Sequence, residues 1–241
     1  MHPSSESLER LVPDELAGGD VTGSESLRIH LERYAFAARH ARPGRLLDLA
    51  CGVGYGTRLL AERGGGIEEA VGVDVAPEAV AYGRAHYAGG GVRFVEADGL
   101  AFRDAAGFDT VVSLETIEHV ADPVALVAHL TSLLRPGGVL VASAPTTPSV
   151  DANPHHLHDF TPRSFRRLFD PARLVERDAL LQVQRFRPLA MARRAEKRTT
   201  DLRPDLARWY LRHPRAAAAR AWSTLRHGFA NHYLTLVWQR S

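Results

Sequence analysis

Two segments of the sequence combine carboxylate and imidazole side chains at spacings suited to chemistry. Residues 113–120 read Ser-Leu-Glu-Thr-Ile-Glu-His-Val, and residues 155–159 read His-His-Leu-His-Asp. In a helical turn Glu115 lies three and four residues from Glu118 and His119, so we expect these three side chains on one face. Converging carboxylates and imidazoles suit a divalent cation: oxygen ligands favour Mg²⁺ or Mn²⁺, and imidazole shifts the preference toward heavier metals.

The same residues also suit a site without a metal. Histidine has an intrinsic pKa of about 6.5, which fits it to remove a proton near neutral pH. His119 and His158 are therefore candidate general bases, with His156 as a third candidate. A purely structural interpretation is also open, in which Glu115 caps backbone groups, His119 is satisfied in the core and the loop histidines are solvated.

A second group of residues predicts a nucleoside pocket. Residues 48–56, Asp-Leu-Ala-Cys-Gly-Val-Gly-Tyr-Gly, place glycines at alternate positions, where the backbone turns sharply and approaches a ligand closely. Asp74 and Asp98 each follow an apolar run, and such acids accept hydrogen bonds from ribose hydroxyls and an adenine amino group. The predicted cofactor contacts in these segments and at the end of the fourth run are Asp48, Ala50, Cys51, Gly52, Tyr55, Asp74, Val75, Asp98, Gly99 and Leu114.

An alternation of apolar runs and helical stretches must position these residues. The runs predict strands at 45–50, 70–75, 92–97, 108–114 and 139–144, followed by extended segments near 172–184 and at 232–240. Helices are predicted at 24–40, 56–63, 77–87, 122–134 and 161–169, with the fourth ending at Pro136-Gly137-Gly138. Nearly all-apolar strands alternating with helices indicate a parallel sheet covered on both faces. Ligands bind such sheets beyond the carboxyl ends of the strands, which is where the polar residues fall.

Four segments in this order resemble the class I S-adenosylmethionine-dependent methyltransferases. They are LLDLACGVGYG, VGVDV, EAD and LLRPGGVL, within residues 45–144. The resemblance implies a doubly wound α/β fold with a seven-stranded, mostly parallel sheet whose last strand is antiparallel. It also implies S-adenosylmethionine as the cofactor. We expect an arm and lid helix over 1–44, and a methyltransferase domain over 45–241 with a helical insertion at 187–228 before the last strand.

Two further segments resemble a narrower group that modifies glycans and natural products. Residues 30–37, His-Leu-Glu-Arg-Tyr-Ala-Phe-Ala, look like its N-terminal lid, and the resemblance implies that Arg33 pairs with the methionyl carboxylate of the cofactor. The motif Asn-Pro-His-His-Leu-His-Asp-Phe resembles the acceptor-site loop of the same group, whereas Glu-Thr-Ile-Glu-His-Val resembles a motif of small-molecule O-methyltransferases of quinone and polysaccharide pathways. A few relatives with an E-x-x-E-H segment and a later histidine hold Mg²⁺ there, which would carry over to Glu115, Glu118, His119 and either His156 or His158.

Composition narrows the classes of partner. The net charge of +2 is too small to indicate a nucleic-acid partner. Cys51 is the only cysteine and no apolar stretch approaches a membrane span, which favours a protein of the reducing cytoplasm. Residues 187–228 hold eleven Arg and Lys against three acids, so this insertion suits an anionic acceptor, a peripheral membrane contact or a solvated face. The oligomeric state stays open.

The sequence therefore predicts methyl transfer to a hydroxyl of a small molecule, such as a glycan or a glycosylated natural product. N-methylation of an amino sugar or another small amine is the alternative, because a neutral amine needs less deprotonation. A nicotinamide-dependent oxidoreductase is disfavoured by the alternate glycine spacing. A binding protein that keeps the fold without turnover is disfavoured by the intact acids and glycines.

Overall fold

The structure is a computed structural model that describes residues 21–185 and 205–241. Side chains are described from Glu25 onward in the first of these ranges. Most of the expected N-terminal arm, and residues 187–204 of the expected insertion, lie outside the described residues. Among the helices of the described ranges, none combines the length and the apolar character needed to cross a membrane.

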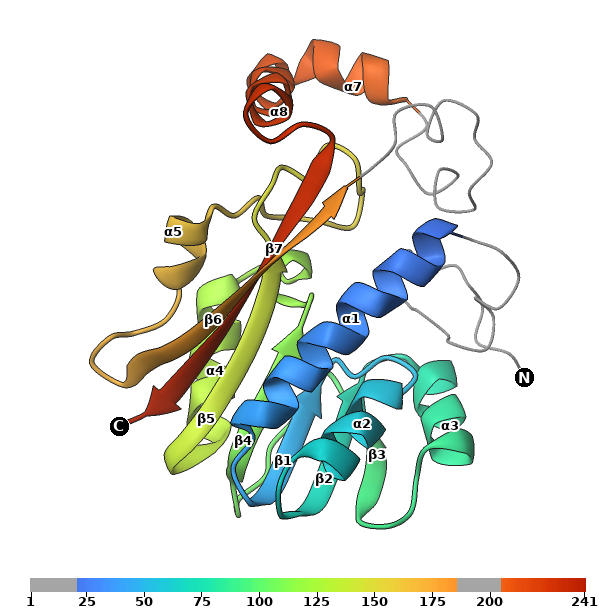
Figure 1. The fold of residues 1–241 in the computed structure, drawn as a ribbon, viewed down its shortest axis with the longest axis vertical. Coiled ribbons are helices and arrows are strands. Elements are labelled where there is room, and N and C mark those ends of the chain that lie inside the picture. Colours follow the sequence, from blue (N-terminus) through green and yellow to red (C-terminus); the bar gives the residue numbers. More distant parts are fainter. Residues whose placement is uncertain (1–20, 186–204) are drawn as a thin grey trace.

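Seven strands form one sheet in the order β3-β2-β1-β4-β5-β7-β6 (Figure 1). The first five pair in parallel, and β7 runs antiparallel to both β5 and β6. The predicted seven-stranded, mostly parallel sheet with an antiparallel last strand is confirmed. The strands are β1 (Gly44–Leu49), β2 (Ile67–Asp74), β3 (Val92–Glu96), β4 (Phe108–Leu114), β5 (Leu134–Pro145), β6 (Leu174–Arg185) and β7 (Ala230–Arg240).

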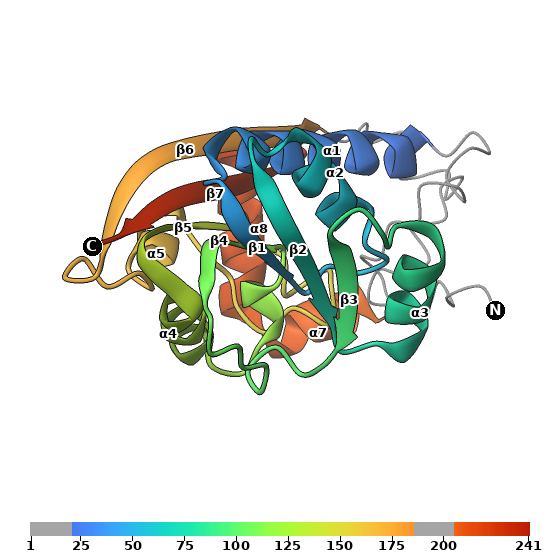
Figure 2. The same cartoon turned by 90° about the horizontal axis from the view of Figure 1, so that it is seen from below.

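Helices cover both faces of the sheet, as Figure 2 shows from below. The helices are α1 (Val21–His40), α2 (Tyr55–Arg63), α3 (Pro77–His86), the short 3-10 helix η2 (Ile117–His119), α4 (Pro123–Leu133), α5 (Pro162–Arg166), α7 (Leu206–Arg212) and α8 (Pro214–His227). Apolar residues of α1, α2 and α3 pack on one face, and those of α4 and α5 pack on the other. Helices α7 and α8 confirm helical structure in the described part of the insertion.

The alternation of side chains along β1 assigns its residues to the two layers. Leu46 packs with α1 and α2, whereas Leu47 and Leu49 pack with the α4 layer. Asp48 shares the side of Leu46 and therefore points under α1, where it meets Tyr34 and Thr57. The strand that leads to the glycine-rich turn thus carries a carboxylate into the core.

One predicted boundary was wrong. The strand after the fourth helix was expected to begin at residue 139, after Pro136-Gly137-Gly138, but β5 begins at Leu134, directly after α4 ends at Leu133. Leu134 pairs with Phe108 at the start of β4, so the Pro-Gly-Gly segment lies inside the strand. Gly137 has φ of +77° and the β4–β5 register shifts near its start, which accommodates the irregularity.

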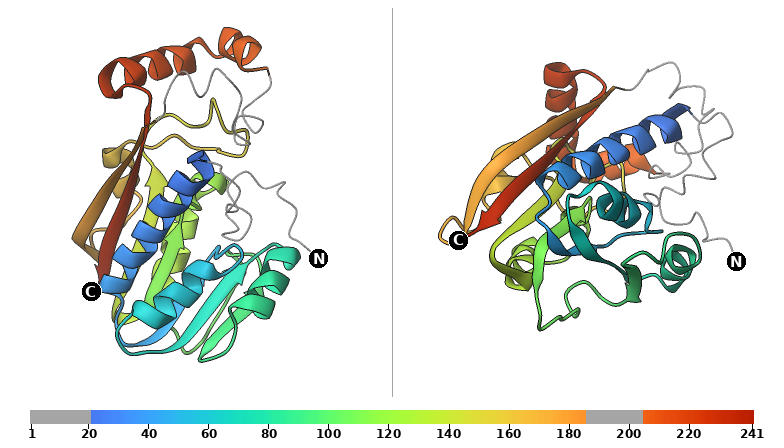
Figure 3. Two further views of the ribbon diagram at one scale, coloured as in Figure 1. Left: turned by 45° about the vertical axis from the view of Figure 1, so that its right-hand side comes forward. Right: turned by 60° about the horizontal axis from the view of Figure 1, so that its bottom comes forward.

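The lid helix α1 lies across the half of the sheet that contains β6 and β7, and also contacts α2 (Figure 3). Polar side chains join it to alternate residues of β6. Ser26 accepts from Gln184, Arg33 donates to Gln182 and His40 pairs with Asp178. A Cβ at Gly56 would lie 1.9 Å from the Tyr34 ring, so glycine at the start of α2 permits close packing of α1. The lid helix is therefore fixed to the sheet by specific contacts.

Candidate cofactor and acceptor site

A pocket of about 200 Å³ opens at the carboxyl ends of β1, β2 and β3. Its wall combines apolar side chains with two carboxylates, as expected for a site that receives a nucleoside. The lining residues are Leu49, Ala50, Val73, Asp74, Val75, Ala97, Asp98, Gly99, Leu100, Thr116, Val120 and Leu126. Five predicted cofactor residues, Ala50, Asp74, Val75, Asp98 and Gly99, thus meet in one pocket.

The glycine-rich turn is built from left-handed backbone. Ala50, Gly52 and Gly54 have φ of +64°, +56° and +92°, a region that costs a side chain energy and glycine nothing. The turn folds back on β2, because the amides of Ala50 and Cys51 both donate to the carbonyl of Val73, at 2.8 and 3.0 Å. This brings the turn beside Asp74.

Asp74 is held in place by backbone amides on both oxygens. Gly52 N donates to Oδ2 at 2.8 Å, and Ala76 N donates to Oδ1 at 3.0 Å. Each carboxylate oxygen has more than one acceptor position, so Asp74 retains capacity for ribose hydroxyls. These two hydrogen bonds fix the carboxylate at the carboxyl end of β2.

Asp98, at the end of β3, both caps a turn and lines the pocket. Its Oδ1 accepts from Leu100 N at 2.7 Å and from Ala101 N at 3.2 Å, which caps the turn that follows. The side chain is exposed and lines the pocket. The turn-capping interpretation and the pocket-lining interpretation therefore hold together.

The remaining predicted cofactor residues surround the pocket without lining it. Asp48 is buried and accepts from Thr57 Oγ1 at 2.7 Å and from Tyr34 OH at 3.4 Å. Burial raises the pKa of Asp48 to about 7, against the lowering effect of these two hydrogen bonds. The Asp48 carboxyl therefore titrates near neutrality in the folded protein.

Cys51, Tyr55 and Leu114 have packing partners in the structure. Cys51 is buried against the β2 backbone, and burial raises the pKa of its thiol well above the usual range, which opposes nucleophilic chemistry. The Tyr55 hydroxyl lies 3.0 Å from His30 Nδ1 and thereby joins α2 to the lid helix. Leu114 is buried at the end of β4.

Arg33 lies in a buried polar cluster between α1 and the sheet. Its side chain is 2% exposed, with Nη1 2.9 Å from Glu115 Oε1. Its Nε donates to Gln182 Oε1 at 2.9 Å, and the guanidinium lies 4.5 Å from the centre of the Tyr233 ring. Arg33 thus has protein partners from β4, β6 and β7, and pairing with a cofactor carboxylate stays a prediction.

The prediction that Glu115 shares a helical face with Glu118 and His119 was wrong. Glu115 has φ of +53°, and η2 begins only at Ile117. The left-handed residue turns the carboxylate toward Ser143, whose hydroxyl donates to Oε1 at 2.7 Å, and toward Arg33. Contacts with residues distant in sequence therefore remove Glu115 from the helical turn.

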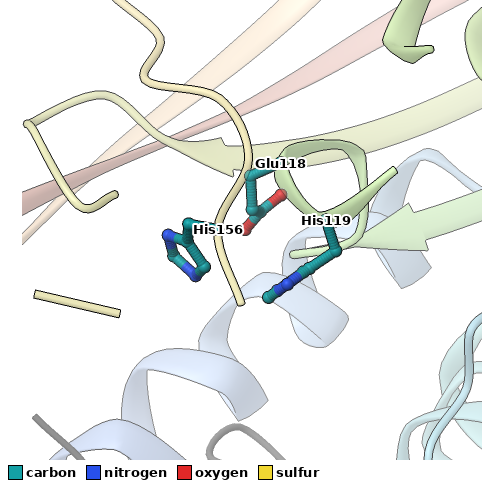
Figure 4. Close-up of side chains that lie close together, drawn as sticks. All are labelled: Glu118, His119 and His156. Carbon is teal, nitrogen blue, oxygen red and sulfur yellow. The ribbon is translucent and has the colours of Figure 1, made fainter. Parts of the chain in front are cut away.

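Glu118 and His119 instead lie close to His156, which belongs to the loop after β5, as Figure 4 shows. One ligand atom of each of these three residues lies within 4.8 Å of the others. The two imidazole rings meet edge to face with centroids 4.7 Å apart. The donor set is one carboxylate and two imidazoles, which is chemically suited to a divalent metal. Glu115 and His158, two members of the predicted ligand set, are outside this cluster.

Hydrogen bonds to carbonyl groups decide which tautomer two histidines adopt in their neutral form, because a carbonyl oxygen only accepts. His119 donates from Nδ1 to the His155 carbonyl at 3.1 Å, so its Nε2 carries the lone pair. His158 donates from Nε2 to the Val120 carbonyl at 2.9 Å, which leaves Nδ1 as its basic nitrogen. His156 Nδ1 lies 2.7 Å from Ser149 Oγ.

The turn after β4 joins the pocket to the histidine cluster. Thr116 and Val120 line the pocket, and Glu118 and His119 between them point toward His156. Thr116 and Val120 lie in the segment singled out by its acids and histidine, but their pocket contacts were not predicted. Leu126, from α4, carried no sequence signal for a ligand. The two halves of the site are therefore within one short turn of each other.

Sequence reasoning also missed the residues that hold the loop after β5, residues 146–161, which we call the acceptor loop because its histidine-rich motif resembles an acceptor-site loop. Asp151 is buried and accepts two hydrogen bonds from Arg220 of α8, at 2.5 and 2.7 Å, and one from Tyr210 of α7. Arg220 also donates to the Pro148 carbonyl at 2.6 Å. The described part of the basic insertion is thereby attached to the loop that carries His156.

Comparisons with known proteins agree with this geometry. Residues 47–142, which contain the pocket, match the family model described as a methyltransferase domain. The chain is 38% identical over 112 residues to the ubiquinone biosynthesis O-methyltransferase of Xanthomonas campestris pv. campestris (strain B100), covering 44% of this chain and 46% of that relative. The enzyme of the same name from Cereibacter sphaeroides (strain ATCC 17025 / ATH 2.4.3) is 40% identical over 105 residues, 41% of this chain and 40% of the relative. The chain thus spans less than half the length of these relatives.

Solved structures share the fold over most of the chain. The N-methyltransferase NodS of Bradyrhizobium japonicum WM9, in complex with S-adenosylhomocysteine, has a TM-score of 0.61 at 16% identity and covers 98% of this chain and 97% of its own. The YcgJ protein of Bacillus subtilis has a TM-score of 0.65 at 15% identity, covering 88% and 99%. The fold is therefore the Rossmann-like methyltransferase fold. The matched domain and this fold support the predicted enzyme class, an S-adenosylmethionine-dependent methyltransferase.

Proposed function

We propose that the chain transfers the methyl group of S-adenosylmethionine to a hydroxyl of a small molecule. The observation that carries the proposal is the turn after β4, where Thr116 and Val120 line the nucleoside pocket while His119 faces His156. Methyl transfer needs a nucleoside pocket and, for a hydroxyl acceptor, a group that takes a proton beside it. The same short turn supplies both.

The pocket residues fit the nucleoside part of this cofactor. Asp74 is fixed by two backbone amides and is suited to ribose hydroxyls. Asp98, exposed at the next strand end, is suited to the adenine amino group. Leu49, Val73, Ala97 and Leu126 supply apolar contacts for the base. When bound, S-adenosylmethionine supplies a methyl group on a cationic sulfur.

His119 is the proposed general base. Its Nδ1 hydrogen bond to the His155 carbonyl fixes the ring and leaves the lone pair on Nε2, on the imidazole that meets His156. An acceptor hydroxyl placed at Nε2 would lose its proton as the oxygen attacks the methyl carbon, and the carbon–sulfur bond breaks as the carbon–oxygen bond forms. His158 is the less favoured base, because it lies outside the cluster.

A divalent cation is the alternative means of activating the hydroxyl. Glu118, His119 and His156 are the residues that would hold it, by one oxygen and two nitrogens. Such an ion would lower the pKa of a bound hydroxyl. Activity measured after chelation and after addition of Mg²⁺ or Mn²⁺ distinguishes the two versions of the site.

Two acceptor classes follow from different observations. The names of the similar relatives, ubiquinone biosynthesis O-methyltransferases, favour a phenolic hydroxyl on a ring. The resemblance of the lid and of the histidine-rich loop to enzymes that modify glycans favours a sugar hydroxyl. Both acceptors fit a general base at His119, so acceptor screening must include each.

The proposal is tested by calorimetric titration with S-adenosylhomocysteine, followed by methyl transfer to catechol-type and sugar acceptors. We expect stoichiometric binding that is lost in the Asp74→Ala variant and kept in the Glu62→Ala variant, a matched acid exposed on α2. Binding without turnover on any acceptor would favour the non-catalytic alternative. Binding of NADH in place of S-adenosylhomocysteine by the folded protein would overturn the proposal.

A further inference from the structure

Helices α7 and α8 lie beyond the ends of β6 and β7 (Figure 1). Residues 206–229 contain five arginines and two histidines but no aspartate or glutamate. The segment therefore combines positive charge with exposed apolar side chains. Neither feature is used by the proposed methyl transfer.

The two faces of α8 have different environments. Ser223 is buried and Arg220 binds Asp151, so this face is attached to the acceptor loop. Trp222 is 67% exposed and Leu225 is 83% exposed, on the opposite face. Leu211 of α7, at 83%, and Phe229, at 55%, add to the apolar surface. We call these four residues the apolar patch.

Arginines flank the apolar patch. Arg215 and Arg226 are exposed and lie seven residues before and four residues after Trp222, which puts all three on one side of α8. Arg212, at the end of α7, is also exposed. A helix with a tryptophan and a leucine between arginines matches the composition of helices that lie in a membrane interface.

We propose that the α7–α8 surface docks on an anionic lipid bilayer. The arginines are complementary to acidic headgroups, and the apolar patch enters the interface between headgroups and acyl chains. A second copy of the chain is a poorer occupant, because a symmetric contact on this segment would bring arginines together without acids. The docking does not depend on methyl transfer.

The position of this surface has a consequence for the acceptor, if the proposed function holds. Arg220 connects α8 to Asp151 and Pro148, in the loop that contains His156. Docking through the outer face of α8 would therefore leave the acceptor loop on the inner side of this helix, about one helix diameter (~10 Å) from the lipid surface. An acceptor with an apolar tail, anchored in the bilayer, suits that position.

The test is sedimentation of the full chain with vesicles, without cofactor or acceptor. We expect binding to vesicles of equal phosphatidylcholine and phosphatidylglycerol, little binding to pure phosphatidylcholine, and weakening at high salt. The Trp222→Ser/Leu225→Ser variant and the Arg215→Gln/Arg226→Gln variant should each lose at least tenfold in apparent affinity. The Val124→Ser/Val175→Ser variant, which changes exposed apolar residues elsewhere, should bind like the unchanged protein.

Tryptophan fluorescence gives a second measurement on the unchanged protein. Brominated lipid should quench part of the emission on docking. In a Trp209→Phe background, which removes the tryptophan of α7, the Trp222→Phe change should abolish that quenching, because Trp238 is buried. Failure to sediment with either vesicle, or equal binding by the Trp222→Ser/Leu225→Ser variant, would overturn the proposal. A dimer that this variant dissociates, without lipid binding, would assign the surface to a second copy and would also overturn it.

Discussion

The guanidinium of Arg33 lies 2.9 Å from the carboxylate of Glu115, and this ion pair lies between the lid helix and the end of β4, with the two side chains 2% and 11% exposed. Glu115 immediately precedes the turn that lines the pocket and carries His119. The pair therefore connects the position of the lid to the position of the candidate base. Ser143 also donates a hydrogen bond to Glu115, and Gln182 accepts one from Arg33.

We predict that Arg33→Ala strongly destabilises the fold. Removing the guanidinium leaves the Glu115 carboxylate buried without its countercharge, which costs about 3–5 kcal/mol in comparable pairs. Urea denaturation measures the free energy of unfolding. An Arg33→Ala/Glu115→Gln variant should recover part of the loss, because it no longer buries an unpaired charge.

Arg28→Ala is the matched control for this loss. Arg28 lies on the same helix, but its side chain is 52% exposed and its partners are the surface acids Glu25 and Glu32. Exposed pairs contribute at most about 1 kcal/mol. Equal losses for Arg28→Ala and Arg33→Ala would contradict a stabilising role for the buried pair.

The sequence predicted the pocket better than the polar cluster, for a physical reason. Asp74 and Asp98 follow parallel strands, and parallel strands end at a common edge, so their convergence follows from local patterns. Glu115 was misplaced because its conformation depends on Ser143 and Arg33, which are far away in the sequence. The Arg220–Asp151 pair, 69 residues apart, has no local signal at all.

The start of β5 is a second feature that the local sequence did not predict. Pro136-Gly137-Gly138 is a good local signal for the end of a helix, and the α4 pattern before it is continuous. Pairing of Leu134 with Phe108 nevertheless begins the strand earlier. Strand pairing overrides local propensity there, whereas the strands without such a signal at their ends were placed within a few residues.

We predict that Asp48 makes the stability of the protein decrease as pH rises toward neutrality. Burial raises the pKa of Asp48 from 3.8 in a model compound to about 7 in the fold, so the folded state binds more protons between these values. The contribution of Asp48 to the free energy of unfolding is therefore largest below pH 3.8 and is lost as pH rises through about 7. The loss is on the order of 4 kcal/mol.

The Asp48→Asn variant removes this titration while its amide oxygen still accepts from Thr57. The free energy of unfolding of the variant minus that of the unchanged protein should therefore increase from pH 5 to pH 8, because only the unchanged protein loses stability through Asp48. Urea denaturation at four pH values measures the difference, in which the other titrating groups cancel. A difference that is constant over this range would refute the raised pKa.

Asp151 should have the opposite dependence on pH. Burial alone would raise its pKa, but hydrogen bonds from Arg220 and Tyr210 outweigh burial and the pKa is lowered below 3.8. Stability from Asp151 is therefore present above pH 3.8 and is lost as pH falls through the lower folded value. Asp151→Asn should cost about 2 kcal/mol at pH 7, and the loss should shrink at pH 3. Glu62→Gln, in an exposed pair, should cost little at either pH.

We predict that His119→Gln lowers kcat by about 10²–10⁴-fold, the usual contribution of a general base. The glutamine amide can still donate to the His155 carbonyl, so the turn after β4 should keep its shape and the affinity for S-adenosylhomocysteine should stay within twofold. Steady-state kinetics and calorimetry measure the two quantities separately. His86→Gln on α3 is the control, because the hydrogen bond between His86 Nδ1 and the Tyr82 carbonyl lies within one helix. If His158→Gln abolishes activity and His119→Gln does not, the base is His158, which would accept the proton at Nδ1 because its Nε2 donates to the Val120 carbonyl.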